Sequence, residues 1–491
     1  MASLRAFRNL APLAVSLSLA LSAAACAGAD GDDDEANLTQ REGDPAKGRV
    51  AILNNGYPNK PYISCGVPYS LWNKVRPATP ASDRIGGRIG HNAELPYYLS
   101  TAVTSRGVEV VSANCLFCHG GKIEDKVIVG LGDSMRDFTY SGALVGPIQT
   151  VVTQAAGFLA GLTRDERAEF DRFRKHMAVT ADYVETDTVG MNPAATMFGL
   201  FAGFRDPVTL KNREAPEPWM RRWLTTENAA LVSDVPSWWT TAKKRRAIYY
   251  GGFGVGDHAR LMMNASLLCL EDANEARVID QSFGDIRAFV RSVKPPVFPR
   301  AVDMALAARG KYIYEQTCEQ CHGSPKKNNY PDAVIALGRV GTDARYNDFM
   351  SGEFGQRSMD WFNRSWWGTN GNAAKMEMPT YAGYLAPPLD GVWATAPYLH
   401  NGSVPTLEAL LDSSKRPKYW LRSFDSTDYD YAALGWRFKT LEHGKEHLLN
   451  VFVKKKVYDT TRAGFSNAGH TFGDRLTPAD RKAVLELLKT F

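Results

Sequence analysis

The sequence predicts a mainly α-helical protein that consists of two similar units with long loop insertions. The motif Cys-x-x-Cys-His occurs twice, at 115–119 and 318–322. An Arg-Gly pair stands before each copy at the same distance, with Gly107 and Gly310 eight positions ahead of the first cysteine. Each half also closes with a segment whose apolar residues follow helical spacing. A chain of 491 residues with 44% hydrophobic content is long enough for two buried cores.

The N-terminus indicates export. Arg5 and Arg8 precede an apolar run that is too short for a membrane anchor, so we expect residues 1–26 to be a signal peptide. The sequence around Cys26 fits a small-x-small cleavage site and also resembles a lipoprotein box. We favour a lipid on Cys26, because residues 27–45 then form an acidic, flexible tether; the alternative is a merely disordered mature N-terminus. Both predict a periplasmic, outer-membrane or cell-surface protein.

The two Cys-x-x-Cys-His motifs match the attachment signature of c-type haem. Two thiols at this spacing can each bond to one vinyl group of a porphyrin, and the adjoining histidine can bind the iron as proximal ligand. A zinc ribbon or a thioredoxin-like redox pair is the alternative, but a ribbon needs its two pairs closer together. We therefore expect two covalently bound haem c groups. They would be held by Cys115, Cys118, Cys318 and Cys321, with His119 and His322 as metal ligands.

Both units are expected to end in an amphipathic helix. In the first, a capping box from Ser282 to Asp285 predicts a helix that stops at Pro295. In the second, Thr477 is the predicted N-cap and Asp480 completes the box, with a proline at the first helical position between them. A haem motif followed by a last amphipathic helix resembles the build of a cytochrome c module.

This pattern divides the chain into a first cytochrome c-like domain over 46–299 and a second over 300–491. Each is longer than a bare cytochrome c fold, so we expect long insertions around the haems. The polar stretches 211–219 and 324–332, rich in turn-forming residues, are predicted loops.

The sixth ligand of the second iron is expected from the loop before the last helix. That loop, 466–473, contains His470, which we choose as the ligand. His400, Met376 and Met378 remain open as alternatives. An iron with two histidine ligands has a low potential and suits electron transfer.

The corresponding stretch of the first unit, 264–281, contains neither histidine nor methionine. We therefore expect the first iron to be open or only weakly closed. His258 and Arg260 lie upstream and are the candidate catalytic residues, because either could help to polarise or cleave an O–O bond. Met262 and Met263 could still reach the iron, although a helix that packs its methionines into the core is commoner.

Two cysteines, Cys65 and Cys269, are left after the haem motifs and Cys26. They either form a disulfide in an oxidising compartment or stay buried as free thiols.

Charge excludes one class of partner. The formal net charge of +5 falls to +3 when Arg5 and Arg8 leave with the signal peptide, which is too weak for a nucleic-acid footprint. The basic run 243–246 is either a solvated face, or a docking site for an acidic redox partner or haem propionates.

The segment 396–407 reads Ala-Pro-Tyr-Leu-His-Asn-Gly-Ser-Val-Pro-Thr-Leu. It resembles the Ala-Pro-Tyr-x-His-x-Gly-Ser-x-x-Thr-Leu element of bacterial dihaem cytochrome c peroxidases, and the chain is most similar to their rubber oxygenase-like branch. The resemblance implies that one haem meets peroxide or dioxygen while the other supplies electrons. It also implies a second haem with two histidine ligands, because the sequence around His470 resembles the C-terminal ligand loop of that branch, and it makes His400 structural or interfacial.

The chain also departs from these relatives. Rubber oxygenases are considerably longer, and bacterial peroxidases use a methionine on the electron-transferring haem, whereas none follows Met378 here. The resemblance allows a calcium ion between the units. It also allows electron relay through tryptophan, although large aromatic residues are more often core. The available ones are Trp238, Trp239, Trp361, Trp366, Trp367 and Trp393.

Together these features predict an exported dihaem oxidoreductase whose first haem reacts with peroxide or dioxygen and whose second haem transfers electrons. The expected partners are a small redox protein or a quinol-linked donor or acceptor, with peroxide, dioxygen or an organic molecule as substrate. One alternative is a pure electron carrier with both irons six-coordinate. Another is a surface lipoprotein whose haems mainly serve folding.

Overall fold

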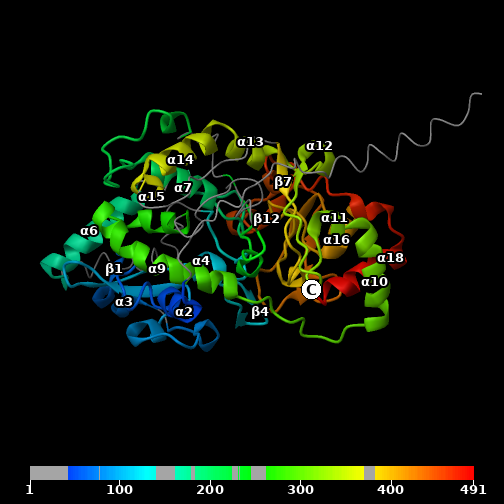
Figure 1. Cartoon of the computed structure of the whole chain (residues 1–491), viewed down its shortest axis with the longest axis horizontal. Helices are drawn as coiled ribbons and strands as arrows, with labels where there is room; N and C mark the ends of the chain where they lie inside the picture. Colours follow the sequence, from blue (N-terminus) through cyan, green and yellow to red (C-terminus); the bar gives the residue numbers. More distant parts are fainter. Residues whose placement is uncertain are drawn as a thin grey trace, which may run out of the picture.

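The computed structural model describes residues 43–76, 78–139, 161–178, 183–223, 231, 233–244, 261–369 and 382–491. The predicted signal peptide, Cys26 and all but the end of the predicted tether lie outside these ranges. Helices dominate the described part, which confirms a mainly α protein (Figure 1). None of the described helices is long and apolar enough to cross a membrane. The α-helices are α2 (Pro45–Leu53), α3 (Tyr69–Val75), α4 (Leu116–His119), α6 (Arg164–Ala178), α7 (Ala194–Gly203), α9 (Ala273–Ser292), α10 (Met304–Thr317), α11 (Glu319–His322), α12 (Leu337–Val340), α13 (Arg345–Ser351), α14 (Glu353–Arg364), α15 (Trp366–Thr369), α16 (Leu407–Leu411), α17 (Val451–Lys454) and α18 (Pro478–Leu488).

Short antiparallel strands lie between the helices. The three-stranded sheets have the orders β1-β3-β2 and β11-β8-β12, and the described two-stranded ones pair β4 with β5, β6 with β7 and β9 with β10. The strands are β1 (Val67–Pro68), β2 (Leu99–Val103), β3 (Glu109–Ala113), β4 (Lys122–Ile123), β5 (Lys126–Val127), β6 (Val334–Ala336), β7 (Gly383–Leu385), β8 (Tyr419–Leu421), β9 (Tyr429–Asp430), β10 (Gly435–Trp436), β11 (Lys439–Thr440) and β12 (Val457–Asp459). The loops predicted at 211–219 and 324–332 contain no helix or strand.

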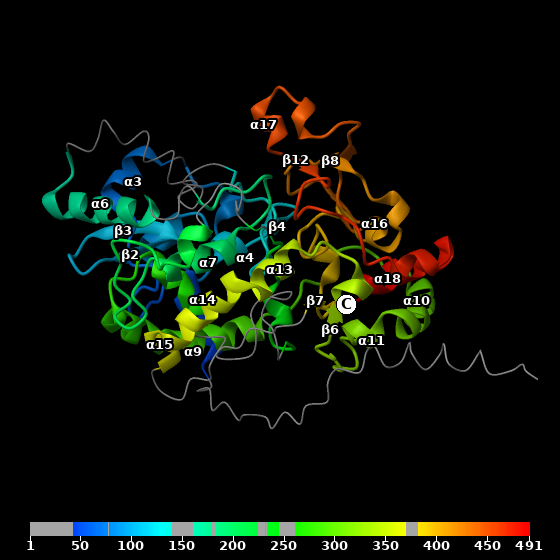
Figure 2. The same cartoon turned by 90° about the horizontal axis from the view of Figure 1, so that it is seen from above.

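Two pairs of helices pack closely together. Helix α2 packs on α9, and α10 packs on α18, which the two views place side by side at one end of the molecule (Figures 1 and 2). A glycine lies where each pair of helices meets. A Cβ on Gly48 would overlap the Asp285 carbonyl, and one on Gly310 would overlap the Ala483 carbonyl. Each pair therefore brings two backbones close together.

The repeated Arg-Gly pairs are not structurally equivalent. Gly310 lies inside α10, whereas Gly107 lies in the turn between β2 and β3 at a φ of +75°, with open space where its Cβ would be. Its N–H donates to Thr104 O and closes that turn. Gly48 of α2, not Gly107, lies where two helices approach closely, and strands β1, β2 and β3 follow α2 before the first motif.

Helix α9 begins nine residues before the predicted capping box. Its N-cap is Asp272, whose carboxylate accepts hydrogen bonds from the backbone N–H groups of the first turn. Ser282 and Asp285 lie inside α9, where their side chains accept hydrogen bonds from residues near α2. Ser282 accepts from Asn59 Nδ2 at 3.0 Å, and Asp285 accepts from Asp44 N at 2.8 Å. The predicted start was wrong because these polar residues tie α9 to the α2 segment; the predicted stop before Pro295 is confirmed.

Helix α18 begins as the sequence predicts. The Thr477 hydroxyl accepts from Asp480 N at 3.2 Å, and Pro478 occupies the first helical position. The apolar side chains Val484, Leu487 and Leu488 are buried in a core that also contains Tyr314 of α10.

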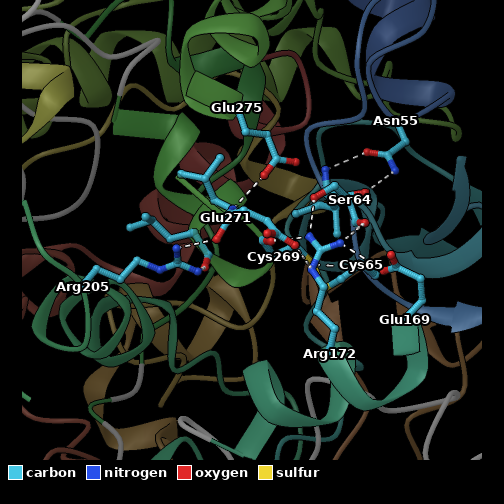
Figure 3. The surroundings of a disulfide bond; sticks show 12 residues. Asn55, Ser64, Cys65, Glu169, Arg172, Arg205, Cys269, Glu271 and Glu275 are labelled. Carbon is cyan, nitrogen blue, oxygen red and sulfur yellow. Dashed lines mark hydrogen bonds and ion pairs between the residues drawn. A yellow bond between two sulfur atoms is a disulfide. The ribbon is translucent and has the colours of Figure 1, made fainter. Parts of the chain in front are cut away.

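Cys65 and Cys269 form a disulfide and are therefore not free thiols (Figure 3). The bond joins the segment after α2 to the segment before α9. Arg172 of α6 lies beside it and donates from Nη2 to Cys269 O at 2.8 Å and to Ser64 Oγ at 3.1 Å. The Arg172 side chain also pairs with the fully buried carboxylate of Glu169 at 3.1 Å. The disulfide and this ion pair hold together three segments that are distant in sequence.

Candidate functional site

The second Cys-x-x-Cys-His motif follows α10 without interruption. The backbone N–H of Cys318 donates to Tyr314 O at 2.8 Å, so the helical path continues to Cys318 before α11 begins. Gly323 ends α11 at a φ of +61°, and its carbonyl accepts from the Tyr314 hydroxyl at 2.7 Å. This turn presents both thiols and the imidazole of His322 to one cavity.

The cavity has a volume of about 220 Å³ and mainly apolar walls built by α10, α18, the 384–400 segment and the loop before α18. Its wall includes Cys318, Cys321, His322, His400 and His470. Both cysteines are free of disulfide bonds. An apolar cavity with two cysteine thiols and facing imidazoles in its wall has the groups that covalent haem attachment requires. The residues present therefore fit a c-type haem.

His322 is oriented by the backbone. Its Nδ1 lies 2.8 Å from Pro387 O. Because a carbonyl oxygen only accepts, Nδ1 must carry the proton, which leaves Nε2 of the neutral ring as the nitrogen that can bind metal. Burial lowers the pKa of His322 and so favours that neutral form.

His470 faces His322 across the cavity. The two ring centres lie 6.1 Å apart. A metal ion held about 2.0 Å from one nitrogen of each ring, with roughly 1 Å more to each ring centre, would require a separation of about 6 Å. Burial lowers the pKa of His470 to about 3, and its Nδ1 is a buried polar atom with no hydrogen-bond partner. The spacing of the two rings is thus compatible with both imidazoles binding the same metal ion.

His400 has a different role in this geometry. Its ring stacks on Tyr384 with centres 4.2 Å apart, and its Nε2 lies 3.2 Å from the Tyr384 hydroxyl. The ring is therefore packed and bonded to Tyr384, as expected of a structural residue. The two methionines that could also supply a sixth ligand, Met376 and Met378, lie outside the described residues.

The first motif follows strand β3 and forms α4. The Cys118 thiol is 3.3 Å from Asn192 Nδ2, and His119 is buried against Trp238, with ring centres 5.0 Å apart. Burial lowers the pKa of His119 to about 4, and the Pro236 backbone partly opposes this shift. Two free thiols beside a buried neutral imidazole also fit a c-type haem at this site.

The candidate catalytic residues His258 and Arg260 lie outside the described residues. Met263 is fully buried in a core that also contains Ile52 of α2 and Phe283 of α9, the larger core of the described residues, and Met262 packs against this core. This agrees with the interpretation that these methionines are core residues. Among the described residues, Trp238 places its ring beside His119, whereas His470 places its ring opposite His322.

The segment 234–240 lies between the two sites. Trp238 packs against His119 in the larger core, and the next residue, Trp239, belongs to the second core and donates from Nε1 to Asp390 O at 2.7 Å. Pro236 and Asp390 both contribute to the wall of the cavity at the second motif, which is called the second cavity because it belongs to the second site. The other tryptophans named from the sequence, Trp361, Trp366, Trp367 and Trp393, are core residues.

The basic run is not a solvated face at its first two positions. Lys243 pairs with Asp390 at 2.7 Å, and Lys244 is only 4% exposed and lines the second cavity. Burial lowers the pKa of Lys244 to about 8, against the attraction of Asp332. The two following arginines lie outside the described residues. Among the residues with assigned positions, no group of three or more acidic, histidine or cysteine side chains is placed to hold a metal ion.

Sequence reasoning missed the groups that orient the proposed ligands. The Pro387 backbone carbonyl accepts from the His322 ring. The guanidinium of Arg416 donates to the backbone carbonyl of His470. Such contacts leave no residue-type pattern in the chain, so only the fold could reveal them.

Comparison with known proteins identifies one family segment. Residues 383–421 match the family described as RoxA-like, cytochrome c-like, a stretch that contains Pro387, His400 and Arg416. With the two motifs, this match supports a c-type cytochrome with covalently bound haem c, and in general a haem-type oxidoreductase.

Two uncharacterized proteins of Sinorhizobium fredii are similar over longer stretches. One, y4iM, is 29% identical over 260 residues, which are 49% of this chain and 57% of the relative. The other, y4iJ, is 41% identical over 118 residues, which are 22% of this chain and 17% of the relative. The matches thus span little more than half of the first relative and a small part of the second. A solved structure of Kuenenia stuttgartiensis hydrazine synthase matches 64% of this chain and 92% of its own with 12% identity and a TM-score of 0.25.

Proposed function

We propose that this protein is an exported dihaem c-type cytochrome that acts as an oxidoreductase, with a first haem that reacts with peroxide or dioxygen and a second haem that transfers electrons. The observation that carries the proposal is a difference between the two sites within the described residues, which leave out 245–260. His322 faces a second imidazole at metal-binding distance, whereas Trp238 is the ring beside His119. A closed site suits electron transfer, and an open one suits binding of a small oxidant.

When bound, haem c supplies one-electron redox chemistry and, at an open axial position, a place where peroxide or dioxygen can react. The chain supplies attachment and orientation. Cys115 and Cys118 would hold the first group and Cys318 and Cys321 the second. His119 and His322 would bind the irons in neutral form, as their lowered pKa values favour. The close packing of α2 on α9 and of α10 on α18 supports a two-unit organisation over 46–299 and 300–491.

The segment 234–240 would connect the two sites. Trp238 contacts His119, and Trp239 bonds to Asp390 in the wall of the second cavity. Two consecutive buried aromatic residues thus reach from one site toward the other. Aromatic rings at such a junction would let an electron that enters at the second site leave at the first.

Reduction of one hydrogen peroxide to two waters consumes two electrons and two protons. One electron from each site would meet the electron demand, and a small redox protein or a quinol-linked donor would replace them. His258 and Arg260 are the proposed groups for handling the protons and polarising the O–O bond. Export, and anchoring through a lipid on Cys26, belong to this proposal as well.

The fully reduced, haem-loaded protein should be mixed with one equivalent of hydrogen peroxide while the absorbance of each haem is followed. The proposal predicts that both haems are oxidised, and that a variant lacking the second haem, Cys318→Ala with Cys321→Ala, still reacts but delivers one electron fewer. If neither haem is oxidised by peroxide or by dioxygen, the oxidoreductase proposal fails and electron carriage alone remains.

A further inference from the structure

Arg416 has an unusual set of partners for an arginine in a loop. Its Nε donates to Ala409 O at 3.1 Å and one Nη2 hydrogen to Leu410 O at 3.0 Å. Its Nη1 donates to Asn467 O at 2.8 Å and Gly469 O at 2.6 Å, and Nη2 also donates to His470 O at 3.0 Å. A guanidinium has five N–H donors, and here each has a backbone carbonyl to meet it.

These carbonyls come from two different parts of the fold. Ala409 and Leu410 lie in the last turn of α16, where carbonyl groups have no partner within the helix and a positive charge is favourable. Asn467, Gly469 and His470 form the loop that carries the proposed ligand. Arg416 therefore fastens the end of a helix, rigidly packed in the second core, to the backbone of the His470 loop.

The loop needs such a fastening. His470 has a φ of +45° and Gly469 one of +76°, so two consecutive residues lie in the left-handed region that costs a non-glycine residue free energy. Gly469 is pressed against Gly341 and Thr342, where a Cβ would overlap backbone atoms. On that side the His470 N–H donates to Val340 O at 2.6 Å. On the other side the His470 carbonyl accepts from Arg416 Nη2.

We propose that Arg416 is a positioning residue that holds His470 toward His322 and thereby keeps the second metal site closed. This inference rests on the proposed function, in which His470 is the sixth ligand of the second haem. Without the guanidinium, three loop carbonyls and two helix carbonyls lose their donors, and the loop can relax out of its strained conformation. The second site would then open to small ligands.

Lysine cannot replace Arg416 fully. Its ammonium carries three donors at one point, whereas the guanidinium presents five in a planar fork that reaches both segments at once. Arg416→Lys should therefore give a partly open site, and Arg416→Gln a more open one. This graded order separates positioning from a general effect of the positive charge.

The test compares Arg416→Gln, Arg416→Lys and His470→Ala in the haem-loaded full chain. The matched control is Arg437→Gln, which removes an exposed arginine that pairs with Asp428 at 3.5 Å. Carbon monoxide binding to the reduced protein and electron paramagnetic resonance of the oxidised protein report the state of the second haem, and thermal unfolding reports folding. We expect His470→Ala to open the second haem completely. Arg416→Gln should raise its carbon monoxide-bound fraction more than ten-fold, Arg416→Lys should raise it less, and Arg437→Gln should leave it unchanged.

The two ways of failing are distinct. If His470→Ala leaves the second haem closed, the proposed ligand is wrong. If His470→Ala opens it but both folded Arg416 variants stay closed, the positioning role is overturned while the ligand stands. Should Arg416→Gln not fold, Arg416→Lys decides alone, because a folded and fully closed Arg416→Lys would contradict the graded order.

Discussion

The imidazole rings of His322 and His470 lie 6.1 Å apart, although they come from near the two ends of the second half of the chain. His322 is held through its ring and His470 through its backbone. The Pro387 carbonyl holds His322 by its Nδ1, and Arg416 and Val340 hold the backbone of His470. Preorganisation of both proposed ligands by backbone contacts explains how a loop residue can lie opposite a motif residue.

Replacing His470 with methionine should keep the second haem six-coordinate but raise its reduction potential. A thioether stabilises the reduced iron more than an imidazole does, and axial ligands shift haem potentials by amounts on the order of 0.1 V or more. Redox titration of His470→Met against the unmodified protein measures the shift. His400→Phe is the control, since the His400 ring stacks on Tyr384. A second haem that opens to carbon monoxide in that variant, whose phenyl ring cannot bind iron, would make His400 the ligand.

Adding a methyl group at either helix crossing should destabilise the fold. A Cβ at Gly48 or Gly310 would overlap a backbone carbonyl of the partner helix, and overpacking typically costs about 1–3 kcal/mol. Gly48→Ala and Gly310→Ala should therefore lower the thermal unfolding midpoint. Gly338→Ala is the matched control, because nothing lies near its added Cβ and alanine in a helix gains roughly 0.5–1 kcal/mol over glycine. Unchanged midpoints in both crossing variants would refute the close crossings.

Loss of the Cys65–Cys269 disulfide should lower stability without releasing haem. The bridge spans 204 residues, and removing a native disulfide typically costs about 2–5 kcal/mol. The double variant Cys65→Ser with Cys269→Ser should unfold earlier in denaturant. Mild reductant should destabilise the natural chain to the same extent and leave the double variant unaffected, because thioether bonds to haem resist reductant. A reductant effect in the double variant would point to another disulfide.

Trp238 is expected to govern electron exchange between the two sites. Its ring contacts His119, and its neighbour Trp239 bonds to the wall of the second cavity. Trp238→Phe should slow redistribution of an electron in the half-reduced protein while leaving both haem spectra nearly unchanged. Flash photolysis of carbon monoxide from the half-reduced protein measures that rate. Trp361→Phe, which alters a buried tryptophan that donates to Arg205 O, is the control and should have no effect.

Several elements could be predicted because their signals are local. The start of α18 depends on Thr477, Pro478 and Asp480, which contact each other within one turn. The start of α9 could not be predicted from Ser282 and Asp285, because their hydrogen bonds go to residues near α2, more than two hundred positions away. Local capping patterns are informative only when no tertiary partner competes for the same polar groups.

In the candidate site, too, local patterns could be predicted from the sequence and contacts between distant segments could not. The motif residues and His470 could be named from spacing, and the structure places the rings of His322 and His470 6.1 Å apart. The choice between a disulfide and free thiols for Cys65 and Cys269 depended on a distance that spacing does not contain. The Arg-Gly repeat misled because equal spacing to a motif does not require equal structure. Gly107 closes a hairpin turn, and Gly310 makes room for a helix.

The central claim is that one haem is open and the other closed. The most direct test is an optical and electron paramagnetic resonance titration of the haem-loaded protein, first oxidised and then reduced under carbon monoxide. We expect one haem that is high-spin or binds carbon monoxide beside one inert low-spin haem, and we expect Cys318→Ala with Cys321→Ala to remove the inert one. Two inert low-spin haems in every state would contradict the account and leave an electron carrier.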